Sequence, residues 1–267
     1  MRLRASASTA VLRATVLGSS CAIPRPGRAC SSYLLEGEGQ RVILDFGTGA
    51  LANALTYLRA DEIDAIVISH MHADHFLDLI PLRYALTYGS RTNNRCVPVY
   101  LPPGGEAILR GIAGALSREP GGDFFNGVFA ISTYDPARGL SLGPARLRFA
   151  PTLHYVDTFA CRYELKGAST VYSADTAPSE PLVALAREAD LFLCEATLDA
   201  AKAEQYGKRG HLTAREAGLM AREAGVHRLA LTHYPREMTP DALTAGVREV
   251  YQGELTIADD HASYRVG

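Results

Sequence analysis

The stretch AIVISHMHADHFLDLIPL, residues 65–82, places three of the chain's eight histidines and an aspartate directly after an apolar run. Its first five residues predict a buried strand. Extended backbone after that strand would keep His70 and His72 on one side, since residues two apart share a side. Asp74 and His75 would then face a second, adjacent centre. Nitrogen and oxygen ligands without thiolate suit zinc, with manganese or iron as alternatives.

Three further candidate ligands follow other apolar runs. His154 comes after RLRFAPTL, Asp175 after STVYSA and His233 after RLALT. Functional groups of open α/β sheets gather at the carboxyl ends of strands, so we expect these side chains to join the first cluster. Taken singly, each histidine could be a hydrogen-bonded structural residue, and the aspartate could cap a helix. Together they predict two divalent metal ions, one held by His70, His72 and His154, the other by Asp74, His75 and His233, with Asp175 bridging them.

The composition excludes several classes of protein. The 267 residues are 47% hydrophobic and 21% charged, which is typical of a globular chain. A formal net charge of -2 gives no global basic field for nucleic acid. The five cysteines are scattered without a C-x-x-C pair, which argues against disulfides and a thiolate zinc site and favours a reducing, cytoplasmic setting. No apolar run approaches the ~20 residues that a membrane span needs.

The chain alternates Val/Ile/Leu-rich runs with amphipathic segments, which predicts an α/β protein. The Gly- and Pro-rich segment 117–144 is interpreted as an excursion over the surface. No repeat or linker divides the chain, so we expect a single domain over residues 1–267. Strands are expected over 14–19, 31–47 (a hairpin around Gly37 and Gly39), 65–69, 97–101, 145–151, 158–165, 169–175, 191–196, 228–233 and 255–258, and helices over 48–59, 77–88, 104–117, 179–189, 213–225 and 240–251.

The H-x-H-x-D-H pattern of residues 70–75, followed by His154, Asp175 and His233, resembles the signature of the metallo-β-lactamase fold superfamily. The resemblance runs from TVLGSSCAIP to LTHYP and covers nearly the whole chain. It implies a four-layer αββα sandwich, with helices outside two central sheets and a dinuclear site at one sheet edge. It leaves the substrate open, because β-lactams, thioesters, lactones and phosphodiesters are all hydrolysed on this scaffold.

Two further motifs resemble the ribonuclease Z branch of that superfamily. They are CEATLD, which contains Glu195, and GHLTAREAG, which contains His211. In that branch a glutamate and a histidine at these places are thought to pair and to help protonate the departing oxygen. A positioned imidazole of this kind raises the reaction rate by ~10²- to 10⁴-fold. The alternative interpretations are a salt bridge for Glu195 and a helix flank for His211.

Two departures separate the chain from tRNA-processing members. Only a tight turn lies between ACRYELKGA and STVYSADT, where those members usually carry a long substrate-gripping arm. The segment DFGTGAL, Asp45 to Leu51, also lacks the pattern of acidic residues and glycine that is usual in the family. These departures, with the acidic balance of charge, favour a small phosphodiester over a large RNA. The layout looks most like that of short bacterial cyclic-nucleotide phosphodiesterases.

The sequence therefore predicts a cytoplasmic, dinuclear metal-dependent hydrolase that acts as a phosphodiesterase on a small phosphodiester such as a cyclic nucleotide. Asp74 is expected to bind the second metal and orient the attacking water, and His211, steered by Glu195, to act as general acid. The alternatives are a ribonuclease Z-like tRNA 3′-processing endonuclease, an ester, thioester or lactone hydrolase, and a metal-binding regulatory module. The resemblance also implies a homodimer. The remaining residues near the motifs are interpreted as packing, surface or loop residues: Ser19, Ser20, Tyr155, His227, Tyr234, Arg236 and His261.

Overall fold

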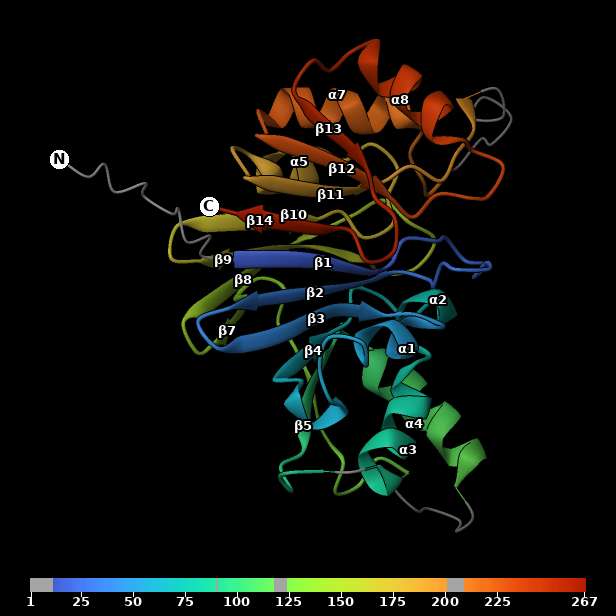
Figure 1. The fold of residues 1–267 in the computed structure, drawn as a ribbon, viewed down its shortest axis with the longest axis vertical. Helices are drawn as coiled ribbons and strands as arrows, with labels where there is room; N and C mark the ends of the chain where they lie inside the picture. Colours follow the sequence, from blue (N-terminus) through green and yellow to red (C-terminus); the bar gives the residue numbers. More distant parts are fainter. Residues whose placement is uncertain (1–11, 90, 118–123, 201–208) are drawn as a thin grey trace, which may run out of the picture.

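Two mixed sheets stack face to face at the centre of the molecule (Figure 1). The computed structural model describes residues 12–89, 91–117, 124–200 and 209–267. Over these residues the first sheet has the order β14-β1-β2-β3-β4-β5-β6 and the second the order β13-β12-β11-β10-β9-β8-β7. The strands are β1 (Leu12–Gly18), β2 (Ser32–Gly37), β3 (Gln40–Phe46), β4 (Ala65–Val67), β5 (Val97–Leu101), β6 (Phe129–Thr133), β7 (Leu140–Leu142), β8 (Ala145–Pro151), β9 (Phe159–Leu165), β10 (Ala168–Tyr172), β11 (Leu191–Glu195), β12 (Arg228–Thr232), β13 (Glu254–Ile257) and β14 (Ser263–Val266).

Helices cover the outer face of each sheet, which completes the αββα sandwich that the sequence predicted (Figure 1). The first sheet carries α1 (Ala50–Ala54), α2 (Ala73–Phe76), α3 (Leu79–Tyr88) and α4 (Gly105–Leu116), together with the short 3₁₀ turn η1 (Ala60–Glu62). The second carries α5 (Glu180–Ala186), α7 (Ala214–Ala224) and α8 (Pro240–Arg248). Helix α7 begins with a capping box between Thr213 and Glu216, and Gly225 ends it in a left-handed conformation.

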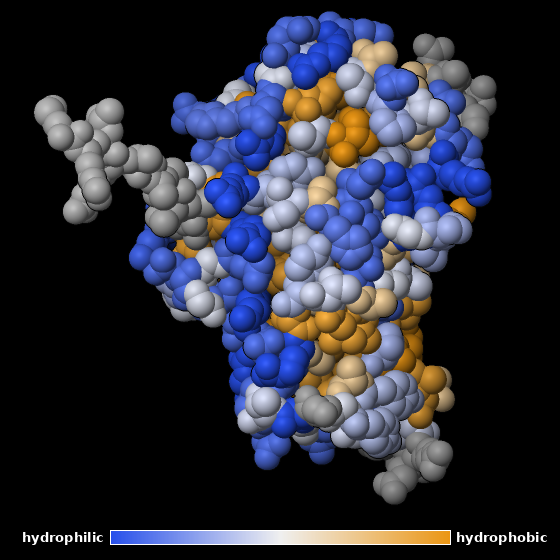
Figure 2. Space-filling view, viewed as in Figure 1, coloured by the Kyte–Doolittle hydropathy of each residue, from blue (hydrophilic) through white to orange (hydrophobic). Residues whose placement is uncertain are grey.

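Apolar side chains fill three layers between these elements. One cluster lies between the sheets and includes Leu44, Tyr163 and Leu193. A second packs the first sheet against α1 to α4, and a third packs the second sheet against α5, α7 and α8. On the surface, Figure 2 shows apolar side chains over the lower half of the view, where α1, α3 and α4 lie. No helix in the described part of the chain is long and apolar enough to cross a membrane.

Each sheet combines an antiparallel half with a parallel half. Strands β3 to β6 and β10 to β13 run parallel, so their carboxyl ends lie at a common edge. Tight turns join the antiparallel pairs: Glu38 and Gly39 between β2 and β3, and Lys166 and Gly167 between β9 and β10, have positive φ. Two-residue turns of this kind match the twist of antiparallel strands. The second turn leaves no room for an inserted arm.

The prediction for segment 117–144 was wrong in part. It contains β6 and β7, each the edge strand of a sheet. Residues 118–123 lie outside the described residues. Most residues of β6 are exposed or only partly buried, so its apolar signal is weak beside the Gly and Pro signal. The four-residue helix α2 and the last strand β14 were also missed.

Candidate metal centre

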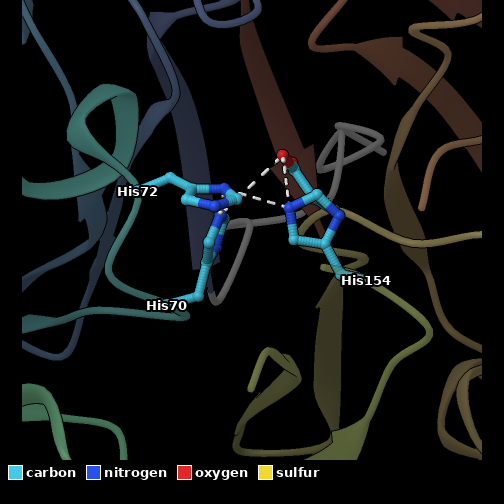
Figure 3. Close-up of side chains that lie close together, drawn as sticks. His70, His72 and His154 are labelled. Atoms are coloured by element: carbon cyan, nitrogen blue, oxygen red, sulfur yellow. Dashed lines mark hydrogen bonds and ion pairs between the residues drawn. The ribbon is translucent and has the colours of Figure 1, made fainter. Parts of the chain in front are cut away.

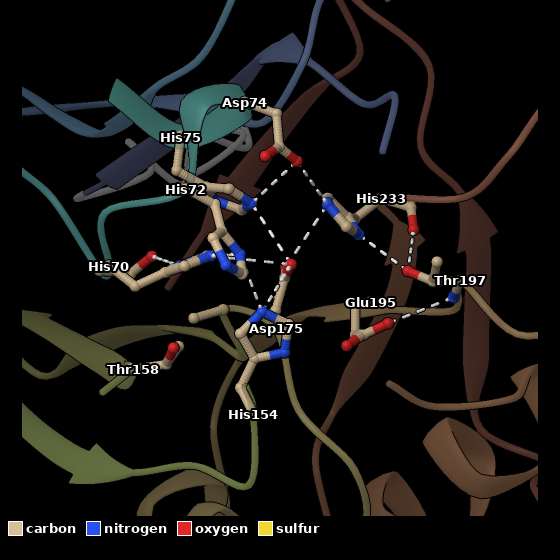
Figure 4. Close-up of polar contacts among 12 residues, drawn as sticks. His70, His72, Asp74, His75, His154, Thr158, Asp175, Glu195, Thr197 and His233 are labelled. Carbon is tan, nitrogen blue, oxygen red and sulfur yellow. Dashed lines mark hydrogen bonds and ion pairs between the residues drawn. The ribbon is translucent and has the colours of Figure 1, made fainter. Parts of the chain in front are cut away.

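All seven predicted ligands lie together at one edge of the two sheets (Figure 4). They follow strands of both sheets: four come after β4, and one each comes after β8, β10 and β12. The turn of α2 begins directly after His72, and it brings the His75 ring to 4.0 Å, centroid to centroid, from the ring of His70. The ligand atoms form two groups that share Asp175, each group with all its atoms within 4.8 Å of one another.

The first group, here called the histidine cage, consists of His70, His72, His154 and Asp175. His72 Nδ1 lies 3.1 Å from His70 Nε2 and 3.0 Å from His154 Nε2 (Figure 3). Burial lowers the pKa of all three imidazoles, most strongly for His70. Three neutral imidazole nitrogens that face one another at this spacing have the chemistry of a divalent-metal site.

The outer nitrogens of the histidine cage are occupied by neutral partners. His154 Nδ1 donates to the Gly210 carbonyl at 2.8 Å. Ser69 Oγ donates to Asp45 Oδ2 at 2.7 Å, so it accepts from His70 Nδ1 at 3.0 Å. Both Nε2 atoms therefore carry lone pairs toward the centre of the cage, as partners on the opposite ring nitrogen impose on metal-binding histidines.

The second group, here called the carboxylate cage, consists of Asp74, His75, Asp175 and His233, all buried. Asp74 Oδ2 lies 3.2 Å from His75 Nε2 and 3.3 Å from His233 Nε2. Burial alone would raise the pKa of Asp74, but the hydrogen bond from His233 and the charges of His75 and His233 hold it well below its usual range. Burial likewise lowers the pKa of His75, but the charges of Asp175 and Asp45 raise it well above its usual value.

The Nδ1 atoms of the two histidines in the carboxylate cage also have hydrogen-bond partners, which orient the rings. His75 Nδ1 donates to Asp45 Oδ2 at 2.7 Å. The Thr197 hydroxyl donates to the His233 carbonyl and accepts from His233 Nδ1, both at 2.8 Å. His233, Asp45 and Ala174, which precedes Asp175, all have positive φ. Strained backbone of this kind concentrates at functional sites because the surrounding structure must hold it in place.

Asp175 stands between the two cages. Its Oδ2 lies 3.4 Å from His75 Nε2 and 3.8 Å from the Nε2 atoms of His70 and His154, and its Oδ1 lies 3.4 Å from His233 Nε2. Burial would raise the pKa of Asp175, but His233 and His75 hold it well below its usual range. Asp175 Oδ1 and His75 Nε2 are buried without a hydrogen-bond partner. Because buried polar atoms are normally satisfied, these two atoms fit a site built for metal ions.

Glu195 and His211 form a pair beside the cages. Glu195 is fully buried at the end of β11, and its Oε1 accepts from His211 Nδ1 at 3.0 Å and from the backbone N–H of Thr176 at 2.6 Å. Its Oε2 accepts from the backbone N–H of Thr197 at 3.2 Å. Burial would lower the pKa of His211, but the charge and hydrogen bond of Glu195 raise it to about 9. The predicted pairing is therefore present, and it leaves His211 Nε2 as the ring nitrogen for proton exchange.

A cavity of about 340 Å³ opens over these groups. None of the described residues that line it is a lysine or an arginine. The lining residues are Cys21, Ala22, His72, Ala73, Asp74, His154, Tyr155, Asp175, Thr197, His211 and His233.

Among the residues that the sequence analysis interpreted as packing, surface or loop residues, one lines the cavity and others make structural contacts. Tyr155 lines the cavity, against the packing or loop role expected for it. Ser19 donates to Asp260, and Ser20 donates to a backbone carbonyl, as structural residues do. His227 and His261 contact Asp190 and Tyr57 respectively, outside both cages. Four residues of the site had no role assigned beforehand: Asp45, Ser69, Thr197 and Gly210.

Comparisons with known proteins agree with this geometry. The family model for the beta-lactamase superfamily domain matches residues 40–234. A probable metallo-hydrolase of Bacillus subtilis, YhfI, is 30% identical over 254 residues, covering 92% of this chain and 97% of its own. Its crystal structure, described as a metallo-beta-lactamase fold protein, superposes with a TM-score of 0.84 at 28% identity, over 96% of this chain and 99% of that one.

Ribonuclease Z proteins also match. The ribonuclease Z of Haloferax volcanii is 29% identical over 299 residues, covering 93% of each chain. The structure of the short form of human tRNase Z has a TM-score of 0.74 at 23% identity, over 96% of this chain and 99% of that one, and shares the fold.

Proposed function

The chain belongs to the beta-lactamase superfamily domain family, whose members are metal-dependent hydrolases, and from this premise we propose that it is a phosphodiesterase for a small phosphodiester such as a cyclic nucleotide. The observation that carries the proposal is the His211–Glu195 pair beside the two cages. Hydrolysis of an alkyl phosphodiester expels a poor leaving group, and a proton donor placed beside the metals removes that difficulty.

The seven residues of the two cages are proposed as the metal ligands. Two divalent ions, zinc in the first instance with manganese and iron as alternatives, would supply a water nucleophile at neutral pH and offset charge on the phosphoryl oxygens. Asp74 lines the cavity as well as the carboxylate cage. Both positions support the proposal that its carboxylate binds the second ion and orients the attacking water.

His211 is proposed as the general acid. Glu195 accepts from Nδ1, so the imidazolium presents its Nε2–H toward the cavity and transfers that proton to the leaving alkoxide oxygen. Two backbone N–H groups, those of Thr176 and Thr197, donate to Glu195 and fix the orientation of its carboxylate. Glu195 thus acts through His211 as a positioning residue.

Two features favour a small substrate over a folded RNA. The turn between β9 and β10 is only Lys166 and Gly167, so no arm extends from it. The described lining of the 340 Å³ cavity also lacks the lysine and arginine side chains that nucleic-acid sites use to neutralise backbone phosphates.

The test is an assay of zinc-loaded protein on bis-p-nitrophenyl phosphate and on cyclic AMP. Replacing the general acid in His211→Ala should lower kcat on cyclic AMP by ~10²- to 10⁴-fold while the metal content stays unchanged. The effect on bis-p-nitrophenyl phosphate should be much smaller, because p-nitrophenolate leaves without a proton. His227→Ala, an exposed histidine outside the cages, is the matched control.

Two outcomes would contradict the proposal. Protein with full metal occupancy that turns over neither substrate is not a phosphodiesterase of this kind. If His211→Ala loses metal and activity together, His211 is a ligand or a structural residue.

The second candidate is tRNA 3′ processing, which the match to the Haloferax volcanii ribonuclease Z favours. A gel assay with precursor tRNA distinguishes it, because a phosphodiesterase for small substrates leaves the 3′ trailer attached. Hydrolysis of an ester, thioester or lactone would proceed with little loss in His211→Ala. A regulatory module would bind metal and turn over none of these substrates.

A further inference from the structure

The loop between β8 and β9 exposes three apolar side chains, one of which lines the cavity. Tyr155, which lines the cavity, is 60% exposed, and its neighbours Leu153 and Val156 are 57% and 41% exposed. Isolated exposed apolar residues are normal on protein surfaces. Three within four residues, on the loop that also carries the cage residue His154, indicate a surface that contacts a ligand.

Tyr155 is held in place although it is exposed. Its ring centroid lies 4.9 Å from that of His154 and 5.9 Å from that of His211, in tilted and edge-on arrangements. Gly210 passes directly beside it, since a Cβ there would come within 3.1 Å of Tyr155 Cε2 and 2.8 Å of His154 Nδ1. The loop is tied at its base by Thr152 N–H to the Thr158 carbonyl at 3.0 Å. One side of the ring is therefore supported by protein and the rest is free.

We propose that Tyr155 is a stacking platform for an aromatic base of the substrate, which makes a nucleoside phosphodiester the substrate class. This inference rests on the proposed function, because it places the base next to His211 and so next to the scissile bond. A fixed aromatic ring offers a flat, apolar face to any base. Among the described residues that line the cavity, Tyr155 is the only phenylalanine, tyrosine or tryptophan, so stacking on an aromatic base falls to this ring.

The first test measures binding without turnover. The chain contains no tryptophan, so Tyr155→Trp introduces a single indole at the proposed platform. We expect 5′-AMP to quench its fluorescence saturably in the zinc-loaded protein and ribose 5-phosphate to leave it unchanged. Tyr88→Trp is the matched control, since Tyr88 is 76% exposed and lies outside the cavity lining. Equal responses to 5′-AMP in the two variants would overturn the proposal.

The second test compares two substrates that differ only in the base, namely cyclic AMP and the 3′,5′-cyclic phosphate of methyl riboside. In Tyr155→Ala the ratio of their kcat/KM values should fall by about 5- to 150-fold, the range expected for loss of one stacked base. Tyr155→Phe keeps the ring and should keep the ratio. An unchanged ratio in Tyr155→Ala would contradict the platform.

The two tests separate this inference from the proposed function. Quenching by 5′-AMP in a protein that hydrolyses neither substrate supports the platform and refutes the phosphodiesterase. Hydrolysis of both substrates, with equal quenching in the two tryptophan variants and no change of ratio in Tyr155→Ala, supports the phosphodiesterase and refutes the platform.

Discussion

The histidine cage and the carboxylate cage share Asp175 but differ in burial and charge. In the histidine cage, His72 and His154 are only partly buried, and the outer nitrogens of His70 and His154 are hydrogen-bonded to a hydroxyl and a carbonyl. The carboxylate cage is buried throughout, and a third carboxylate, that of Asp45, stands behind it. A doubly charged ion loses more hydration at the deeper position.

The largest expected effect comes from Asp175→Ala, because this residue faces both cages. We expect bound metal, measured by elemental analysis after desalting, to fall toward zero at both cages and turnover to fall to background. Asp157→Ala, an exposed aspartate on the β8–β9 loop, is the control. If Asp175→Ala keeps one metal ion at full occupancy, the two cages bind metal independently and Asp175 is not a ligand that both share.

A smaller and more selective effect is expected for Asp45→Asn. The substitution keeps the shape of the side chain but removes the charge next to His75. Affinity for the metal ion in the carboxylate cage should therefore fall about 10- to 100-fold, and affinity in the histidine cage should fall less. Competition with a chromophoric zinc chelator measures both affinities. Equal loss at the two cages would show that Asp45 acts as much through Ser69 on His70 as directly on His75.

The smallest effect is expected for Ser69→Ala, which removes the neutral partner of His70. Affinity should fall at the histidine cage by about tenfold or less, the lower end of the range for partners behind metal-binding histidines. Thr197→Val removes the neutral partner of His233 in the carboxylate cage and should cost about the same. If Thr197→Val lowers metal affinity as much as Asp45→Asn does, the charge of Asp45 does not explain the difference in metal affinity between the two cages.

The sequence predicted the parts of the site that are local. Each ligand is a histidine or an aspartate placed directly after an apolar strand, and strands such as Val97–Leu101 and Ala145–Pro151 match the predicted bounds. The supporting residues could not be found in this way. Ser69 and Gly210 adjoin His70 and His211 along the chain, but their contacts, like those of Asp45, arise only when distant segments meet. Gly210 is an example, because only the folded chain brings it against His154 and Tyr155. The short edge strands β6 and β7 were not predicted either, because most of their residues are exposed or only partly buried.

The wide spacing of the ligands along the chain has a consequence for biosynthesis. His70 and His72 leave the ribosome early, but neither set of ligands is complete until Asp175 has emerged, and the deeper one also waits for His233. Binding of both proposed metal ions therefore requires that synthesis has passed residue 233. A product truncated before residue 233 would carry several of the histidines without being able to enclose the inner ion.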